Sequence, residues 1–164
     1  MPEILRIASR IVRLDVPKQY TITGLRISIG VIFLWFGIPK FFPGGSPAEP
    51  LAVRTVDALS LGVVEGDCAR ILVASAEIVI ALMLLSGAAN RLTAVLLIGH
   101  LVGACAPLLL FPSDVWRSFG VGTMEGQYMI KNVILVAAAL VIAGHSGQNK
   151  SAESQSRRTC LCDG

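Results

Sequence analysis

Apolar side chains gather in four long stretches of this chain, and shorter polar segments separate them. The stretches run from about residue 20 to 42, 69 to 86, 92 to 111 and 126 to 143. Each comes close to the roughly 20 residues that a helix needs to cross the hydrocarbon core of a bilayer. Backbone amides in lipid must be hydrogen-bonded within their own segment, so we expect the four spans to be helices. The pattern therefore predicts an all-α integral membrane protein, a four-helix bundle surrounded by the lipid bilayer.

Positive charge is distributed unevenly among the polar segments. The N-terminal segment, the tight turn after the second span and the C-terminal tail carry Lys and Arg, whereas acidic residues balance the arginines of the other two loops. Cytoplasmic segments of membrane proteins are enriched in Lys and Arg. We therefore expect both termini to be cytoplasmic, and the two longer loops to lie on the outer side.

Weaker patterns surround the spans. Within residues 1–18, arginines recur at helical spacing opposite apolar residues, which is typical of a basic amphipathic helix in the headgroup region. A disordered basic arm is the alternative. Residues 145–164 turn to Ser, Gln, Asn and Arg, so we expect a disordered cytoplasmic tail. The four-span domain itself is placed at residues 19–144.

The first outer loop has a helical pattern of its own. It opens with a Pro- and Gly-rich run after Phe42, which ends the first span. Apolar residues then recur at the period of a helix, with polar residues between them. A short helix capping the outer face of the bundle is predicted from the apolar positions Ala52, Val56, Leu59 and Val63.

Composition supports the membrane assignment and narrows the chemistry. Of 164 residues, 54% are hydrophobic and only 15% are charged, too few to cover a soluble domain. The net charge of +3 includes no basic cluster interleaved with exposed aromatics, so nucleic acid is not an expected partner. The four cysteines form no CxxC pair, which disfavours a vitamin K epoxide reductase-like enzyme, and we expect no metal site. For Cys160 and Cys162 in the tail, inert thiols and a metal or redox switch are both open.

Several polar side chains fall within the spans, where they are costly and therefore indicate function. Glu77 lies near the middle of the second span, so its carboxylate must be protonated, paired or beside a water-filled cavity. Lys131 could reach the outer surface or pair with Glu77 or Glu125. We expect one polar chamber in the outer half of the bundle, formed by Lys40, Glu77, Glu125, Tyr128, Lys131 and Asn132.

Three further residues could contribute to this site. Arg26, in the first span, could also extend its side chain towards the cytoplasmic headgroups. His100 lies mid-span in the third helix, either as a hydrogen-bonded packing residue or as a ligand-binding one. Trp35 is an aromatic that could hold a quinone head group. The alternative for the whole chamber is an ion-pair network that fixes helix register and has no chemical role.

Two motifs resemble those of a known family. The first span carries an arginine, a glycine, a phenylalanine and then Gly-x-x-Lys, and the fourth span opens with the run Glu-Gly-Gln-Tyr-Met-Ile-Lys-Asn. With Glu77 in the second span, these motifs are similar to the DoxX family, and the resemblance runs from Arg26 to Ala143. The motif residues are Arg26, Gly30, Phe33, Gly37 and Lys40, followed by Glu125 to Asn132.

The resemblance implies a four-helix protein of the bacterial cytoplasmic (inner) membrane. One branch of the family is the small subunit of a thiosulfate:quinone oxidoreductase. Mycobacterial relatives are described as the membrane partner of superoxide dismutase and a sulfurtransferase in thiol and oxidative-stress defence. No catalytic residue of the family is established firmly enough to be carried over to this chain.

Three functions remain open at this point. The first is an accessory or scaffold subunit that holds a soluble redox enzyme, of the superoxide dismutase or sulfurtransferase type, at the membrane. The second is an oxidoreductase subunit that binds quinone, the one cofactor we consider. The third is a small proton- or ion-coupled transporter, which would need to form a homo-oligomer because four short helices leave little room for a pore. We do not expect a stand-alone enzyme.

Overall fold

The computed structural model of the protein describes residues 17–87 and 90–144. The predicted interfacial segment, apart from residues 17 and 18, and the predicted tail lie outside these ranges. The described chain forms four helices that are long and apolar enough to cross a membrane, which confirms the all-α prediction. Their bounds are Gln19–Phe41, Gly66–Ser86, Arg91–Leu110 and Met124–Gly144.

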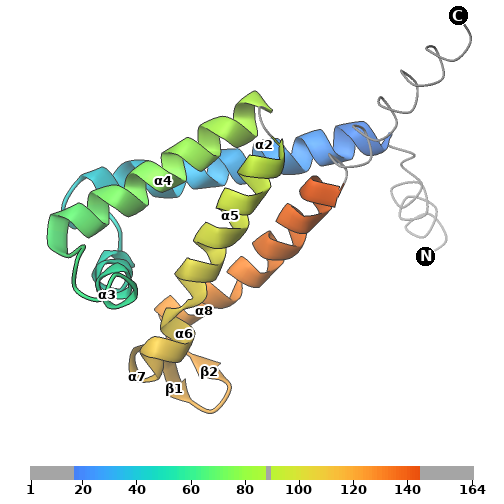
Figure 1. Ribbon diagram of the computed structural model, residues 1–164. Helices are drawn as coiled ribbons and strands as arrows, with labels where there is room; N and C mark the ends of the chain where they lie inside the picture. The colour runs from blue at the N-terminus through green and yellow to red at the C-terminus, as the bar shows by residue number, and fades with distance from the viewer. Residues whose placement is uncertain (1–16, 88–89, 145–164) are drawn as a thin grey trace, which may run out of the picture.

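The first two spans form an antiparallel pair (Figure 1). Helix α2 (Lys18–Gly37) continues as a short 3-10 helix, η1 (Ile38–Phe41), and packs along α4 (Gly66–Ser86). Two glycines of the family motif make this contact close. A Cβ atom added at Gly37 would lie 3.1 Å from the Cβ of Glu77, and one added at Gly30 would lie 3.3 Å from the carbonyl oxygen of Ala81. The missing side chains therefore let the two backbones approach.

The two helices of this pair are staggered. Gly37 lies level with Glu77, in the middle of α4, so α2 and η1 end well before the level at which α4 begins. Helix α3 (Glu49–Leu59) contacts α4 beyond the end of η1 (Figure 1). It is the predicted short helix, but Val63 does not belong to it. The chain turns at Leu61 and Gly62, which both have positive φ, and this turn ends the helical pattern.

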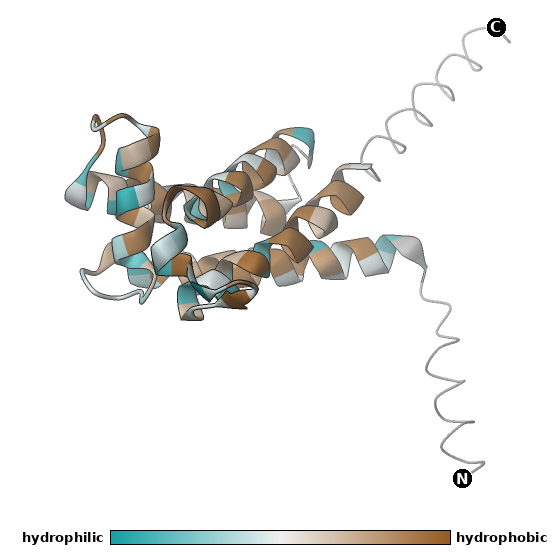
Figure 2. Ribbon diagram, turned by 90° about the horizontal axis from the view of Figure 1, so that it is seen from below, coloured by the Kyte–Doolittle hydropathy of each residue, from teal (hydrophilic) through white to brown (hydrophobic). Residues whose placement is uncertain are grey.

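The third and fourth spans form a second pair. Helix α5 (Asn90–Cys105) is followed by the short α6 (Pro107–Leu110), and α8 (Met124–Ile130) by a helical stretch over residues 132–144. All four spans contribute to one apolar core, and apolar residues predominate along the spanning helices (Figure 2). The core includes Ile29, Phe33, Ile80, Leu84, Leu97, Leu101, Ala139 and Ile142.

A small hairpin links the second pair at the end where α3 lies. Helix α7 (Pro112–Val115) leads into strand β1 (Trp116–Ser118), which pairs with β2 (Val121–Gly122). The sequence predicted only a loop here, because strands this short produce no alternating pattern. A second apolar cluster of Leu51, Val115 and Met129 joins α3 to the hairpin end of the bundle.

Candidate functional site

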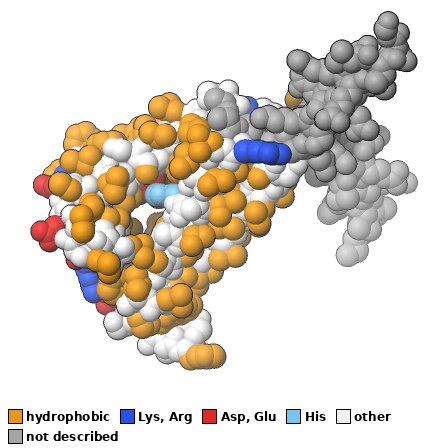
Figure 3. Space-filling view, in the orientation of Figure 1, with side chains coloured by type: hydrophobic (Ala, Val, Ile, Leu, Met, Phe, Trp, Pro, Cys, Tyr) orange, Lys and Arg blue, Asp and Glu red, His pale blue; other side chains and the backbone are white. Residues whose placement is uncertain are grey.

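A cavity of about 290 Å³ lies between the two helix pairs and beneath α3. In Figure 3 the surface is hollowed between α3 and α4 on one side and α5 on the other, with a histidine side chain beside the hollow. Hydrophobic side chains border much of the opening on this face, with the histidine and white-coloured groups between them. The cavity is lined mainly by apolar groups, among them Ile32, Phe33, Phe36, Val56, Leu59, Val73, Leu101, Pro107 and Leu135.

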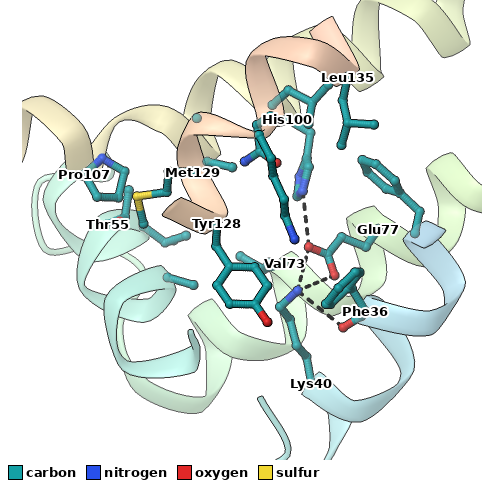
Figure 4. Close-up of a pocket in the computed structure, with 18 of the residues that line it drawn as sticks. Phe36, Lys40, Thr55, Val73, Glu77, His100, Pro107, Tyr128, Met129 and Leu135 are labelled. Carbon is teal, nitrogen blue, oxygen red and sulfur yellow. Dashed lines mark hydrogen bonds and ion pairs between the residues drawn. The ribbon is translucent and has the colours of Figure 1, made fainter. Parts of the chain in front are cut away.

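The polar centre of the cavity is an ion pair between Lys40 and Glu77. The Lys40 ammonium donates hydrogen bonds to both carboxylate oxygens of Glu77, at 2.7 Å and 2.6 Å, and to the carbonyl oxygen of Phe36 at 3.3 Å (Figure 4). Each of the two charged residues is only 8% exposed. Because Gly37 lies level with Glu77, Lys40 reaches the carboxylate directly and does not extend towards the headgroups.

His100 extends this pair to a third helix. Its Nε2 lies 3.3 Å from Oε1 of Glu77, so the carboxylate contacts a basic group on each side (Figure 4). The imidazole ring also packs edge-on against Phe33, with ring centroids 5.6 Å apart. The mid-span histidine is therefore a partner of the predicted carboxylate and contributes to the lining of the cavity.

Lys131 occupies a different environment from Lys40. Its ammonium lies 3.9 Å from the centroid of the Tyr128 ring and 4.8 Å from that of Phe36, distances typical of cation–π contacts. The carboxylate of Glu77 instead pairs with Lys40. Lys131 lies between α8 and the helical stretch over residues 132–144, and its own backbone is helical, with its N–H donating to the carbonyl oxygen of Gln127. Tyr128, Lys131 and Asn132 all line the cavity.

The structure separates the remaining predicted residues from this cluster. Glu125 lies half-buried in the first turn of α8 and is not among the residues that line the cavity. Trp35 is 75% exposed on the outside of α2. The Arg26 guanidinium lies against Gly87, which caps the far end of α4 in a left-handed conformation. Lys40, Glu77, Tyr128, Lys131, Asn132 and His100 are therefore the predicted residues that share the cavity.

The sequence did not single out Arg70, which holds together the segments at the α3 end of the site. One of its terminal nitrogens donates to the carbonyl oxygens of Lys40 at 2.9 Å and Phe41 at 2.7 Å. Its Nε and its other terminal nitrogen donate to Asp67, and Glu49 at the start of α3 lies 3.8 Å away. Arg70 therefore ties the end of η1 to α3 and to the first turn of α4. Its burial, at 7% exposure, is what sequence reasoning missed.

The chemistry that these groups allow is limited. Among the described residues, no group of three His, Cys, Asp or Glu side chains is placed to hold a metal ion. A carboxylate between an ammonium and an imidazole can hold or pass a proton, and the surrounding aromatic and aliphatic groups can bind an apolar molecule. The site combines these two properties in one space within the spanning helices.

Comparison with known proteins gives one match. A family model described as DoxX matches residues 21–110, more than half of the chain. This segment includes Lys40, Glu77 and His100 and ends before Tyr128. No curated protein and no solved structure matches the chain.

Proposed function

Because this chain belongs to the DoxX family, a family of membrane proteins, we propose that it is the membrane subunit of a redox complex and that its cavity binds the head group of a quinone. One observation carries the proposal. An apolar cavity inside the spanning helices holds a carboxylate that is paired with both a lysine and a histidine. A site that only fixed helix register would need the ion pair but no space beside it.

The cavity suits a flat, lipid-soluble ring with two carbonyl oxygens. Such a ligand needs an apolar slot and one or two polar contacts that fix its orientation. Phe33, Phe36 and Tyr128 supply aromatic surfaces, and Lys131 and His100 supply polar groups from two different helices. The hollow in Figure 3 is bordered by hydrophobic side chains, so a molecule dissolved in the bilayer could enter without passing through water.

The ion-paired groups would serve proton uptake beside the ring. Reducing a quinone to a quinol takes up two electrons and two protons, and a buried site must receive those protons through titratable side chains. The hydrogen-bonded chain of Lys40, Glu77 and His100 provides such groups at the wall of the cavity. The two electrons would come from a reduced sulfur compound that the soluble enzyme oxidises, as when two thiosulfate ions join through a new S–S bond to form tetrathionate.

A soluble partner completes this proposal. The protein would be an accessory or scaffold subunit that brings such an enzyme to the quinone pool of the inner membrane. A partner of the superoxide dismutase or sulfurtransferase type would be held at the membrane but would not itself reduce the quinone. This part rests on the family resemblance and on the predicted cytoplasmic position of the basic N-terminal segment and the polar tail. Those segments would form the docking surfaces.

The test is to purify the full-length protein from native membrane in mild detergent, extract bound quinone and identify co-purifying proteins. We expect quinone in near-equal amount to protein, and a soluble redox enzyme in the same fraction. Glu77→Gln should lower the bound quinone, whereas the matched control Glu65→Gln, which removes an exposed carboxylate outside the cavity, should not. A wild-type protein that carries only lipid and binds no added short-chain quinone would refute the quinone site. Purification without any redox enzyme would refute the complex.

A further inference from the structure

The two lysines of the cavity differ in how their charge is balanced. The Lys40 ammonium lies within 2.7 Å of both oxygens of Glu77, so these two charges neutralise each other. Lys131 contacts the faces of two aromatic rings. Among the residues that the structure describes, no carboxylate lies within ion-pair distance of the Lys131 ammonium. The cavity therefore carries an excess of positive charge at Lys131.

A cation without a counter-ion is costly at this depth of a membrane protein. Contacts with the faces of Tyr128 and Phe36 offset only part of that cost, because a cation–π contact is weaker than a desolvated ion pair. The side chain also remains accessible from the cavity. An incoming negative charge would complete its coordination without displacing an existing partner.

We infer that Lys131 binds a negatively charged oxygen of the ligand, so that the cavity prefers a quinone in an anionic form over a neutral quinone of the same size. This inference rests on the proposed quinone site and names its specificity-determining residue. The quinone ring would lie in the apolar part of the cavity, and its charged oxygen would lie near the end of the Lys131 side chain. Tyr128 and Asn132, which line the same wall, would place further polar groups beside that oxygen.

The ion pair at Lys40 leaves this role to Lys131. Glu77 already supplies the negative charge that Lys40 needs, and a ligand oxygen there would have to displace a carboxylate held by two hydrogen bonds. An anion beside Glu77 would also experience repulsion from that carboxylate. Lys40 therefore joins two helices through Glu77, and Lys131 is the cation that is available to the ligand.

The experiment compares two probes on purified full-length protein in lipid nanodiscs. One is a 2-hydroxy-3-alkyl-1,4-naphthoquinone, which is an anion at neutral pH, and the other is its 2-methoxy analogue, which is neutral and of similar size. Dissociation constants are measured by calorimetry. Wild-type protein should bind the anionic probe at least about tenfold more tightly, as expected for a hydrogen bond to a charged group. This comparison needs no variant.

Variants then assign the preference to one side chain. Lys131→Met should abolish the preference, which is the ratio of the two dissociation constants and is read independently of any change in overall affinity. Lys131→Arg, which keeps the charge, should retain the preference, and so should Arg117→Met, which removes an exposed cation outside the cavity. Equal binding of the two probes by wild-type protein, or a preference that survives in Lys131→Met, would overturn the inference and leave the quinone site intact. A wild-type protein that binds neither probe would overturn both.

Discussion

The Lys40–Glu77 ion pair should contribute strongly to the stability of the bundle, and a double-mutant cycle can measure its contribution. The two side chains are only 11% and 10% exposed, and the shortest nitrogen–oxygen distance is 2.6 Å. Removing one member of a buried pair leaves the other charge without a partner, which costs about 3–5 kcal/mol. We therefore expect Lys40→Met and Glu77→Gln each to lower the free energy of unfolding by about this amount. The double variant should lose about 2–3 kcal/mol less than the sum of the two.

The assay is reversible unfolding by SDS in mixed micelles, followed by far-ultraviolet circular dichroism. The chain supplies a matched control in the pair between Arg54 and Asp114, which has the same 2.6 Å distance but side chains that are 56% and 39% exposed. Exposed pairs contribute about 0–1 kcal/mol. The cycle of Arg54→Met and Asp114→Asn should therefore give a coupling energy below about 1 kcal/mol. Equal coupling energies in the two cycles, or additive effects at Lys40 and Glu77, would show that burial does not strengthen the inner pair.

Three further predictions concern packing, the α3 end of the site and orientation. Gly37→Ala should destabilise the protein by about 1–3 kcal/mol, because the new Cβ presses on α4. Gly24→Ala, whose Cβ meets open space, should be neutral or stabilise the protein by up to about 1 kcal/mol. Equal losses of thermal stability in the two variants would contradict the close helix contact. Arg70→Leu should lower the free energy of unfolding by about 2–4 kcal/mol, because the carbonyl oxygens of Lys40 and Phe41 lose their hydrogen bonds. The exposed Arg117→Leu should leave the free energy of unfolding almost unchanged in the same SDS titration. A membrane-impermeant maleimide should label Cys68 on intact cells, since this exposed thiol lies in the first turn of α4 on the predicted outer side. Labelling of Cys68 only after lysis would show the opposite orientation.

The four spans could be predicted because hydropathy acts locally, and each span carries its own signal. Pairing between spans could not be predicted in the same way. Lys40 could equally have extended to the headgroups, since its partner lies 37 residues away in the chain. What decides the outcome is the stagger of α2 against α4, and that stagger depends on close contacts at Gly30 and Gly37. Both glycines belong to the first-span motif, but the motif alone does not set the register of one helix against the other.

Two further residues, Arg70 and Lys131, differ from their predicted environments for similar reasons. Arg70 was grouped with the loop charges because it lies at the very start of the apolar stretch predicted from residue 69, whereas α4 already begins at Gly66 and places Arg70 in its second turn. Its role depends on hydrogen bonds to backbone carbonyls. Every residue has such a carbonyl, so the residue types do not indicate which ones Arg70 will bond. Lys131 was expected to find a carboxylate or the surface, and its contact with two aromatic rings arises only when α2 and the last span meet.

The ion pair within the first helix pair also has a consequence for how the protein is made. A single charge near the centre of a spanning helix raises the free energy of insertion by about 2.5–3.5 kcal/mol. Glu77 holds such a central position in the second span, whereas Lys40 lies next to the end of the first and leaves the ribosome earlier. The cation that neutralises Glu77 is therefore already made when the second span inserts. We therefore expect α2 and α4 to leave the translocon as one hairpin, with α3 carried between them. Biogenesis of this small protein would then begin with a pairing step that precedes release into lipid.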